Sequence, residues 1–246
     1  IVRSDGYILT RGDGVPKQPT CQLPSGRQLA AARIEEIAAD GLVLLRVQAR
    51  GLPVVQWRQG PAPPLGSLLA TPGRGPDSVA VGIVSSRSTP ASGAADDRRL
   101  NHDSILRPVD CGGPVVDLSG LAVGLNLART DRVTTIALSA NAVRDVLDDL
   151  NKHLPVQVEG AGPRPSASQA PPVGLIELQA KIRTAAAKAV ACTVAVQIGA
   201  ARGSGVIASP EGYVLTAAHV IPAADQKATI RLASGKTTAG TCRGSN

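Results

Sequence analysis

The sequence predicts an all-β fold, and three observations lead to this prediction. Residues 1–150 contain many short stretches in which apolar residues alternate with polar ones or run together. Clusters of glycine and proline separate these stretches. Only three aromatic side chains occur in 246 residues (Tyr7, Trp57 and Tyr213), so the interior must consist of Val, Leu, Ile and Ala. Many short strands with such turns are typical of a β-sandwich or β-barrel.

Eight stretches in the first 150 residues carry the strand pattern. Turn sequences such as Pro24-Ser25-Gly26 and Ser119-Gly120 lie between them. We therefore expect strands at residues 7–10, 27–37, 42–47, 68–71, 79–86, 114–116, 122–127 and 133–138.

A helix and a linker follow these strands. Ser139 is suited to cap the helix, and an apolar stripe runs along it. Residues 151–172 are rich in Pro, Ser, Ala and Gly towards their end, which is typical of an extended, semi-flexible linker. The stripe consists of Val143, Val146, Leu147 and Leu150.

Residues 173–246 are predicted to form a helix and the start of a second β unit. Residues 174–190 have helical spacing, with Leu175, Leu178 and Ile182 on one face. We expect the strands of this unit at residues 193–197, 205–208, 213–217 and 228–232.

One motif occurs twice in the chain. Residues 1–10 read IVRSDGYILT and residues 207–216 read IASPEGYVLT, a constant offset of 206 residues. The second copy continues with Ala-Ala-His219-Val, whereas the first continues with Arg-Gly-Asp13-Gly. We infer two copies of one structural unit, with Asp13 at the position of His219.

Two motifs resemble the HtrA-type trypsin-like serine proteases. The segment GSGVIASPEGYVLTAAHVI, residues 203–221, resembles the sequence around the catalytic histidine of that family, here His219. The segment DCGGPVVDLSGLAVG, residues 110–124, resembles the nucleophile loop, with Cys111 in place of serine. The resemblance covers most of residues 1–150 and 190–246.

The resemblance implies a trypsin-like double β-barrel. This fold has two six-stranded barrels, with a C-terminal helix packed on the second. Residues 1–150 are expected to form a degenerate domain of this kind whose N-terminus is missing. The linker at residues 151–172 would lead to residues 173–246, one helix plus the N-terminal part of a second such domain. Both copies are interrupted at an end of the chain, so we expect a fragment of a longer protein.

Trypsin-type catalysis combines three side chains with backbone donors. A nucleophile needs a histidine that accepts its proton and a carboxylate that holds the histidine in the correct tautomer. Backbone N–H groups stabilise the oxyanion, and glycines allow the tight turn that presents them. The resemblance assigns this loop to Cys111, Gly112 and Gly113.

The first copy departs from the family pattern at every triad position. Asp13 replaces the histidine, and a carboxylate is a poor base for a thiol, because the usual pKa values are about 4 and about 8.5. Gly41 occupies the position of the triad carboxylate. Asp40 is one residue away, but strand alternation would direct it to the other face. We expect this domain to be an inactive pseudoprotease.

Cys111 has two interpretations. A small thiol can simply fill a site sized for serine, which is the plainer one. It can instead act as a cysteine nucleophile, for which His102 is the nearby candidate base. A buried or solvated structural histidine at position 102 is the alternative to that role.

His219 has the flanking sequence of an active family member, so we interpret it as a catalytic general base, with a structural histidine as the alternative. Its carboxylate and serine would lie beyond Asn246. A split site joining His219 and Cys111 would require an exchange of half-barrels between the copies.

The composition argues against other classes of function. The net charge of +7 is spread over single Lys and Arg residues, which is typical of a solvated surface rather than a nucleic-acid interface. The four cysteines lack metal-ligand spacing, so we expect no metal and no cofactor. No run of about 18 apolar residues is present to span a membrane. The sequence favours no particular oligomeric state.

The resemblance implies a serine endopeptidase that acts on proteins or peptides. Cleavage would be carried out by the second domain of the longer protein. A non-catalytic peptide-binding or regulatory module is the alternative, and a cysteine protease using Cys111 is a weaker one. The family also implies an extracytoplasmic location, periplasmic or secreted.

Overall fold

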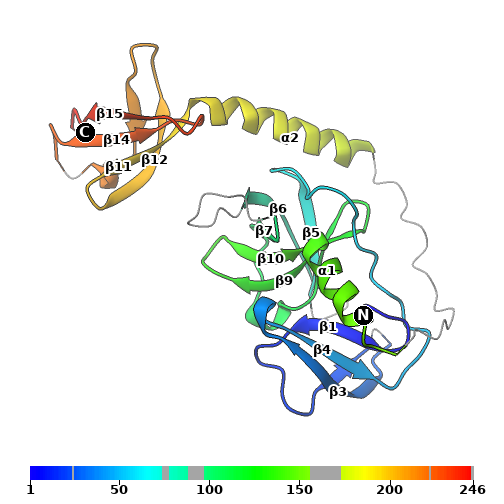
Figure 1. Ribbon diagram of the computed structural model, residues 1–246. Coiled ribbons are helices and arrows are strands. Elements are labelled where there is room, and N and C mark those ends of the chain that lie inside the picture. Colours follow the sequence, from blue (N-terminus) through cyan, green and yellow to red (C-terminus); the bar gives the residue numbers. More distant parts are fainter. Residues whose placement is uncertain (24, 74–77, 88–96, 156–172, 222, 245–246) are drawn as a thin grey trace. The chain divides into compact units, whose positions relative to one another are not determined.

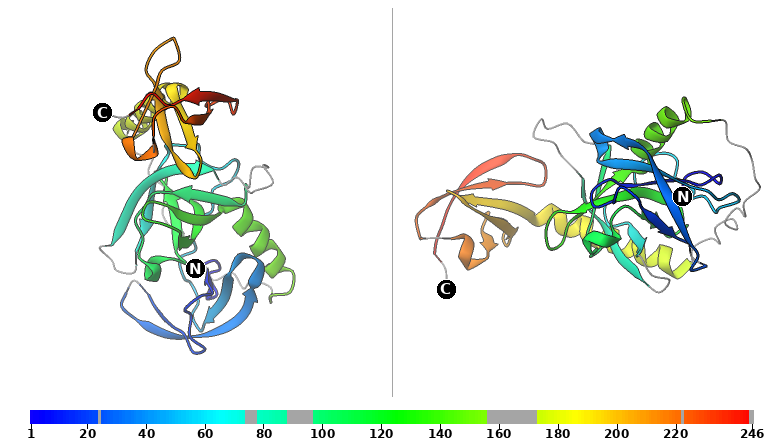
Figure 2. Two further views of the ribbon diagram at one scale, coloured as in Figure 1. Left: turned by 90° about the vertical axis from the view of Figure 1, so that its left-hand side faces the viewer. Right: turned by 90° about the horizontal axis from the view of Figure 1, so that it is seen from below.

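The computed structural model of the chain describes residues 1–23, 25–73, 78–87, 97–155, 173–221 and 223–244 (Figures 1 and 2). These residues form two compact units, Ile1–Gln179 and Ala180–Asn246, which are described separately below. Most of the expected linker, residues 156–172, lies outside the described residues.

The first unit begins with a four-stranded antiparallel sheet in the order β1-β4-β3-β2. Its central strand β4 carries the apolar run Leu-Val-Leu-Leu, and Val43 and Val47 are completely buried. Because β4 is covered on both faces and both edges, its sequence is continuously apolar rather than alternating. The strands are β1 (Tyr7–Arg11), β2 (Thr20–Gln22), β3 (Gln28–Ile37) and β4 (Leu42–Val47).

Six further strands close into a barrel in the order β10-β7-β6-β5-β8-β9. Its interior is filled by small apolar side chains, among them Leu69, Val115 and Val123. Two short 3₁₀ helices lie outside the sheets, η1 (Ala38–Asp40) and η2 (Pro108–Asp110). The barrel strands are β5 (Leu68–Pro72), β6 (Val79–Arg87), β7 (Arg99–His102), β8 (Pro114–Asp117), β9 (Ala122–Arg129) and β10 (Thr135–Ser139).

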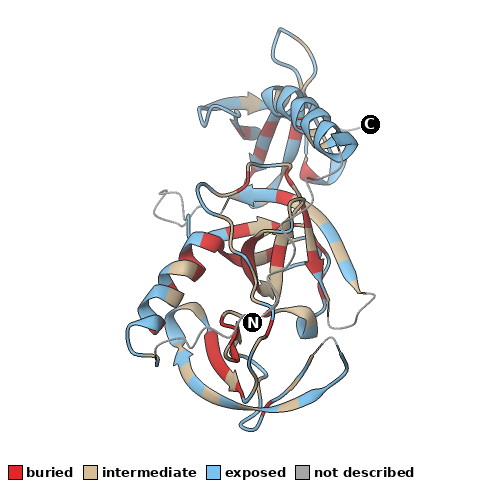
Figure 3. Ribbon diagram, turned by 90° about the vertical axis from the view of Figure 1, so that its right-hand side faces the viewer, coloured by how far each residue is buried: buried red, intermediate tan, exposed pale blue. Residues whose placement is uncertain are grey.

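Helix α1 (Ala140–Asn151) is capped as predicted, because Ser139 Oγ accepts a hydrogen bond from the backbone N–H of Ala142 at 3.3 Å. Its buried face is red in Figure 3 and belongs to one apolar cluster that also includes residues of β1, β4, β9 and β10. This cluster joins the open sheet to the barrel. Its buried members are Tyr7, Leu9, Leu42, Leu44, Leu125, Leu138, Ala142, Val143, Val146 and Leu150.

The second unit contains one five-stranded antiparallel sheet in the order β13-β12-β11-β14-β15. Burial alternates strictly along β11, so one face packs on a small core and the other faces solvent. Helix α2 (Val173–Cys192) spans the division between the units. The strands are β11 (Thr193–Ile198), β12 (Ala201–Ile207), β13 (Val214–Thr216), β14 (Lys227–Arg231) and β15 (Thr237–Thr241), with the 3₁₀ helix η3 (Ala218–Val220) after β13.

The two copies of the repeated motif share one hydrogen-bond pattern. Val2 N donates to Tyr7 O at 2.9 Å, and Ala208 N donates to Tyr213 O at 2.8 Å. The turn glycines Gly6 and Gly212 have φ values of +103° and +92°. Tyr7 is the first residue of β1, whereas Tyr213 precedes β13 by one residue. The two copies of the motif, 206 positions apart, therefore form the same turn.

The structure confirms the trypsin-like double β-barrel class, with two corrections. Within the described residues the first sheet has four strands, whereas the resemblance implied six for a complete barrel. Strands β2, β7 and β15 were not predicted, because their residues are mostly polar and only pairing with neighbouring strands defines them. In the described part of the chain, no helix is both long enough and apolar enough to cross a membrane.

Candidate active site

The nucleophile loop, Cys111 to Gly113, connects η2 to β8. The Cys111 thiol is half-buried, and its Sγ lies 3.8 Å from the carbonyl oxygen of Arg107. Burial raises the pKa of Cys111 above its usual value, and the nearby Arg11 guanidinium offsets part of this increase. The thiol is therefore protonated, and a weak nucleophile, at neutral pH.

Three backbone N–H groups at the start of this loop, those of Asp110, Cys111 and Gly112, have acceptors within the chain. Asp110 N donates to Arg107 O at 2.9 Å, and Cys111 N donates to Pro108 O at 3.4 Å, which forms the η2 turn. Gly112 N donates to Asn126 O at 2.7 Å. An oxyanion hole requires donors that point at the carbonyl of the substrate. These three N–H groups instead point at carbonyl oxygens of the chain itself.

Close packing on β1 explains why position 112 is a glycine. Gly112 has φ +98°, and a Cβ atom there would collide with Thr10 Oγ1 and lie 3.1 Å from Arg11 N. Thr10 Oγ1 donates a hydrogen bond to Gly112 O at 3.2 Å. The loop is thereby held against the end of β1, where the first copy of the repeated motif finishes.

Arg11 lies between the thiol and the carboxylate that stands in for histidine. Its guanidinium interacts with Cys111 and forms an ion pair with Asp13 at 2.9 Å. The Asp13 side chain is 81% exposed. Arg11 has no counterpart in the second copy, where the equivalent residue is Ala217.

Neither Gly41 nor Asp40 provides a carboxylate to this site. Gly41 terminates η1 in the left-handed conformation, and its carbonyl oxygen accepts a hydrogen bond from Gly12 N at 2.8 Å. The Asp40 carboxylate accepts hydrogen bonds from Arg98 at 2.9 and 3.0 Å. Asp40 is thus directed towards Arg98, but it belongs to the 3₁₀ helix η1, so the strand alternation assumed from the sequence does not apply to it.

His102 is completely buried and forms a hydrogen bond to Asn126 instead of Cys111. Its Nε2 lies 2.8 Å from Asn126 Oδ1. Burial lowers the pKa of His102, although Asn126 and the charge of Asp103 oppose this effect. The imidazole is therefore neutral at neutral pH, and Nε2–H must be the donor because an amide oxygen only accepts.

Asn126 connects this histidine to the nucleophile loop. Its side-chain NH₂ group lies 3.3 Å from Gly113 O and 3.4 Å from Pro114 O. Its own backbone N–H donates to Gly113 O at 2.9 Å. Sequence reasoning missed this support, although an asparagine inside the apolar stretch at residues 122–127 indicated a buried amide that needs partners.

His219 occupies the η3 turn directly after β13 and is exposed. Thr216 Oγ1 donates to Ser204 O at 2.7 Å, which fixes the end of β13. The turn that precedes β13 matches the turn that precedes β1, so His219 and Asp13 occupy equivalent positions in their units. His219 belongs to the second unit and Cys111 to the first.

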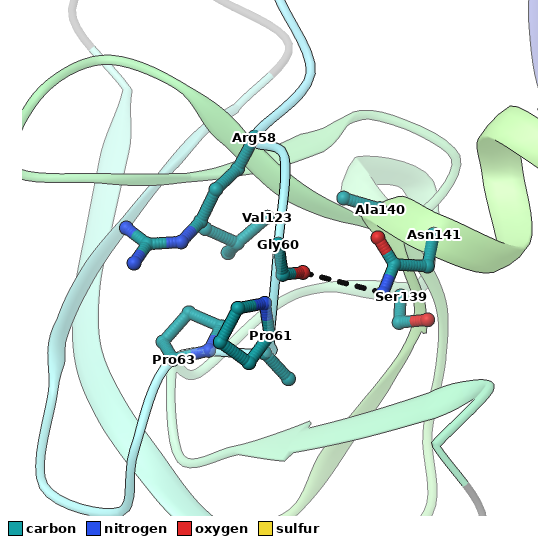
Figure 4. A pocket seen from close by; sticks show the side chains of 9 residues that line it. Arg58, Gly60, Pro61, Pro63, Val123, Ser139, Ala140 and Asn141 are labelled. Carbon is teal, nitrogen blue, oxygen red and sulfur yellow. Dashed lines mark hydrogen bonds between the residues drawn. The ribbon is translucent and has the colours of Figure 1, made fainter.

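The first unit contains a cavity that is too small for a substrate. A cavity beside the start of α1 has a volume of about 10 Å³, room for a single water molecule (Figure 4). Asn141 Nδ2 donates to Gly60 O at 3.3 Å across it. Among the residues that the structure describes, no three His, Cys, Asp or Glu side chains are grouped to hold a metal ion.

Comparison with known proteins agrees with the fold and the motifs. The family described as "trypsin-like peptidase domain" matches residues 1–125, about half of the chain. A protein of Ectopseudomonas mendocina (strain ymp), named "probable periplasmic serine endoprotease DegP-like", is 28% identical over 131 residues, covering 51% of this chain and 28% of that protein. A protein of Pseudomonas fulva (strain 12-X) with the same name is 27% identical over 160 residues, covering 61% and 33%.

The chain spans about a third of the length of these curated relatives. The family match, the double-barrel fold and the paired histidine and nucleophile-loop motifs agree with one another. The chain therefore belongs to the HtrA-type trypsin-like peptidase family.

Proposed function

We propose that the protein combines a non-catalytic trypsin-like unit with the histidine-bearing part of a serine endopeptidase. The observation that carries this proposal is the equivalence of Asp13 and His219 within two copies of one turn. Residues 1–150 would form the pseudoprotease domain. Residues 173–246 would belong to the catalytic domain, whose substrates would be proteins or peptides.

The chemistry around Cys111 supports an inactive first unit. The thiol is protonated at neutral pH, and the side chain that faces it is the cation Arg11 rather than a base. Asp13 is already paired with Arg11, and Gly41 has no side chain with which to orient a base. Three backbone N–H groups of the loop donate to carbonyl oxygens of the chain itself. The first unit thus has no base and no orienting carboxylate beside Cys111, and three of the nearby N–H groups are already hydrogen-bonded within the chain.

His219 supports a catalytic assignment for the second unit. It is exposed at the end of β13, and the flanking Thr-Ala-Ala-His-Val sequence has the form found in active family members. An exposed histidine in a fixed turn is positioned to accept a proton from a nucleophile brought beside it.

The first unit retains an intact fold around the nucleophile loop, which favours a peptide-binding or regulatory role. The barrel is closed and the nucleophile loop is packed against β1. The side chain of Asn126 donates a hydrogen bond to the carbonyl oxygen of Gly113 in this loop. The fold is therefore preserved around a site that has lost its reactive groups. A thiol protease using Cys111 is disfavoured by the raised pKa of the thiol and by the Asn126 partner of His102.

An extracytoplasmic location is part of this proposal. Both relatives are named as periplasmic proteins, and the family resemblance implies the same compartment. Signal for the protein in a periplasmic fraction after osmotic shock would support this location, whereas recovery only with cytoplasmic markers would contradict it.

A peptide-cleavage assay tests the catalytic assignments. We expect the 246-residue chain and its Cys111→Ala and His219→Ala variants to show no turnover with a fluorogenic peptide library. Removal of triad members leaves only about 10³–10⁴-fold acceleration over water, which an ordinary assay does not detect. Turnover that both substitutions abolish would overturn the proposal and establish a Cys–His pair. Labelling of Cys111 by an acylating thiol probe, blocked by His102→Gln, would instead establish a thiol enzyme.

A further inference from the structure

Buried polar side chains interrupt the apolar interior of the barrel in the first unit. His102 and Asn126 are 0% exposed, and Thr135 is 1% exposed. Thr135 lies opposite His102 across β10 and β7, and its Oγ1 donates to Ser104 O at 2.9 Å. His102 is the member of this group that titrates near neutral pH, so its protonation state connects the barrel interior to the pH of the solution.

Asn126 holds the nucleophile loop by four hydrogen bonds. Gly112 N donates to Asn126 O at 2.7 Å, and Asn126 N donates to Gly113 O at 2.9 Å. The side-chain NH₂ group donates to Gly113 O at 3.3 Å and to Pro114 O at 3.4 Å. His102 Nε2–H donates to Asn126 Oδ1 at 2.8 Å, which turns the NH₂ group of the amide towards the loop.

The second ring nitrogen of His102 has no hydrogen-bond partner among the described residues. Nδ1 is buried and carries a lone pair in the neutral tautomer. Protonation would convert Nδ1 into a donor and place a positive charge in the barrel. A buried donor without an acceptor, on a charged group, is strongly unfavourable. The closed arrangement therefore accommodates the neutral imidazole and not the imidazolium.

The neighbours of His102 on the adjoining strands do not compensate for such a charge. They are the uncharged Val84 on β6, Thr135 on β10 and Asn126 on β9. Asp103 is the acidic residue whose charge acts on the ring, and its Oδ1 already accepts from the backbone N–H of Ile83 at 2.7 Å. The guanidinium of Arg129, at the end of β9, donates to carbonyl oxygens of the following turn.

We propose that protonation of His102 opens the contact between Asn126 and the nucleophile loop, so that the loop is held at neutral pH and released in acid. In the open form the ring reaches water, which solvates the cation and accepts from Nδ1–H. The device regulates the shape of the first unit. It holds whether or not this unit is a pseudoprotease, because no step involves the Cys111 thiol.

The direction of the pH dependence follows from the burial of His102. Burial lowers the pKa of the ring in the closed form, whereas a ring exposed to water has a pKa of about 6.5. Between these two pKa values the open form binds more protons, so the opening constant rises as the pH falls. From pH 7.5 to pH 5.5 the rise is at most about tenfold, because the exposed ring becomes protonated only below about pH 6.5.

Amide hydrogen exchange of the full chain tests the proposal. Protection factors, which remove the intrinsic effect of pH on exchange, are measured for the amides of Gly112 and Asn126. We expect both to fall by between about threefold and about tenfold from pH 7.5 to pH 5.5. At both pH values they should stay at least tenfold below those of β4, because the loop opens without global unfolding. An unchanged protection factor, or values equal to those of β4, would overturn the proposal.

Two histidine variants identify the group that titrates. His102→Gln keeps a donor for Asn126 Oδ1 but cannot be protonated, so the two protection factors should change less than twofold between the same pH values. His153→Gln is the matched control, because His153 is exposed and its Nε2 lies 2.9 Å from Glu35 Oε2. This variant should keep the fall of the native chain. An undiminished fall in His102→Gln, or its loss in His153→Gln, would contradict the assignment to His102.

Asp103→Asn gives an independent test that leaves His102 in place. An asparagine Oδ1 can still accept from Ile83 N, but the charge that favours the imidazolium in the closed form is removed. The closed form should then resist protonation to a lower pH. Between pH 7.5 and pH 4.5 the protection factors of Gly112 and Asn126 should fall at least twofold further than in the native chain. An equal or smaller fall would contradict the proposal.

Discussion

At the scale of single residues, Gly112 links the nucleophile loop to β1. Its φ of +98° is unfavourable for any residue with a side chain, and a Cβ atom would collide with Thr10 Oγ1. We expect Gly112→Ala to reduce the free energy of unfolding by about 3 kcal/mol, because backbone strain and overpacking each cost about 1–3 kcal/mol. Urea denaturation measures this loss.

Two glycines nearby provide controls for that substitution. Gly120 has φ +75° but open space around it, so Gly120→Ala should cost only about 1–2 kcal/mol from backbone strain. Gly113 has its nearest neighbours at 3.8 Å and 3.9 Å, so Gly113→Ala should change stability by less than about 1 kcal/mol. Equal losses for all three variants would show that packing on β1 is unimportant.

Because His102 is buried, we expect a specific pH dependence of the free energy of unfolding. Burial lowers the pKa of this histidine in the folded state below its value of about 6.5 in the unfolded chain. Between those two pKa values the unfolded state binds more protons, so stability is complete above about pH 6.5 and is lost as the pH falls. We expect the contribution of His102 to decline by at most about 1.4 kcal/mol per pH unit in that range.

The variant His102→Gln isolates this contribution. A glutamine amide can donate to Asn126 Oδ1 but does not titrate. Urea denaturation at pH 7.5 and pH 5.5 should therefore show a smaller loss for the variant than for the native chain. Identical losses would mean that other groups cause the acid sensitivity.

The candidate site was predictable where it depends on the repeat and unpredictable where it depends on tertiary contacts. The correspondence of Asp13 with His219 follows from ten aligned residues. The interaction of Arg11 with Cys111 joins positions 100 residues apart, and the bond from His102 to Asn126 joins positions 24 apart. No local pattern marks such pairs, because the barrel brings them together only after the strands have paired.

At the scale of elements, Ser139 connects the end of the barrel to α1. Its Oγ accepts from Ala142 N and donates to Asp97 O at 2.8 Å. Loss of a helix cap costs about 1 kcal/mol, and the unpaired buried groups add to that cost. We expect Ser139→Ala to reduce the free energy of unfolding by about 1–3 kcal/mol. The exposed Asp148 on the same helix is the control, and Asp148→Ala should change it by less than about 0.5 kcal/mol.

Sequence patterns predict some of the strands and miss others. Strand β4 was predicted with its observed bounds, because a continuous apolar run between turn residues has few other interpretations. Strands β2 and β15 consist mainly of polar residues, with burial patterns that are mostly exposed. These strands form because β3 and β14 offer edges with which they can hydrogen-bond. Their own residues therefore do not indicate a strand, and only the sequence of the partner strand does.

At the scale of the whole molecule, each unit has its own apolar core, and we expect the two to unfold independently. Trp57 is the sole tryptophan of the chain and packs against the core of the first unit, so its fluorescence reports that unit alone. Leu138→Ala should shift the Trp57 unfolding transition by about 2–5 kcal/mol, because Leu138 is 1% exposed. Ile230→Ala, in the core of the second unit, should leave this transition within about 0.5 kcal/mol of the native value, since Ile230 and Trp57 belong to different cores and share no partners. Circular dichroism of the same samples should detect the weakened second unit as an earlier partial transition. An equal shift of the Trp57 transition by both substitutions would show that the units unfold as one.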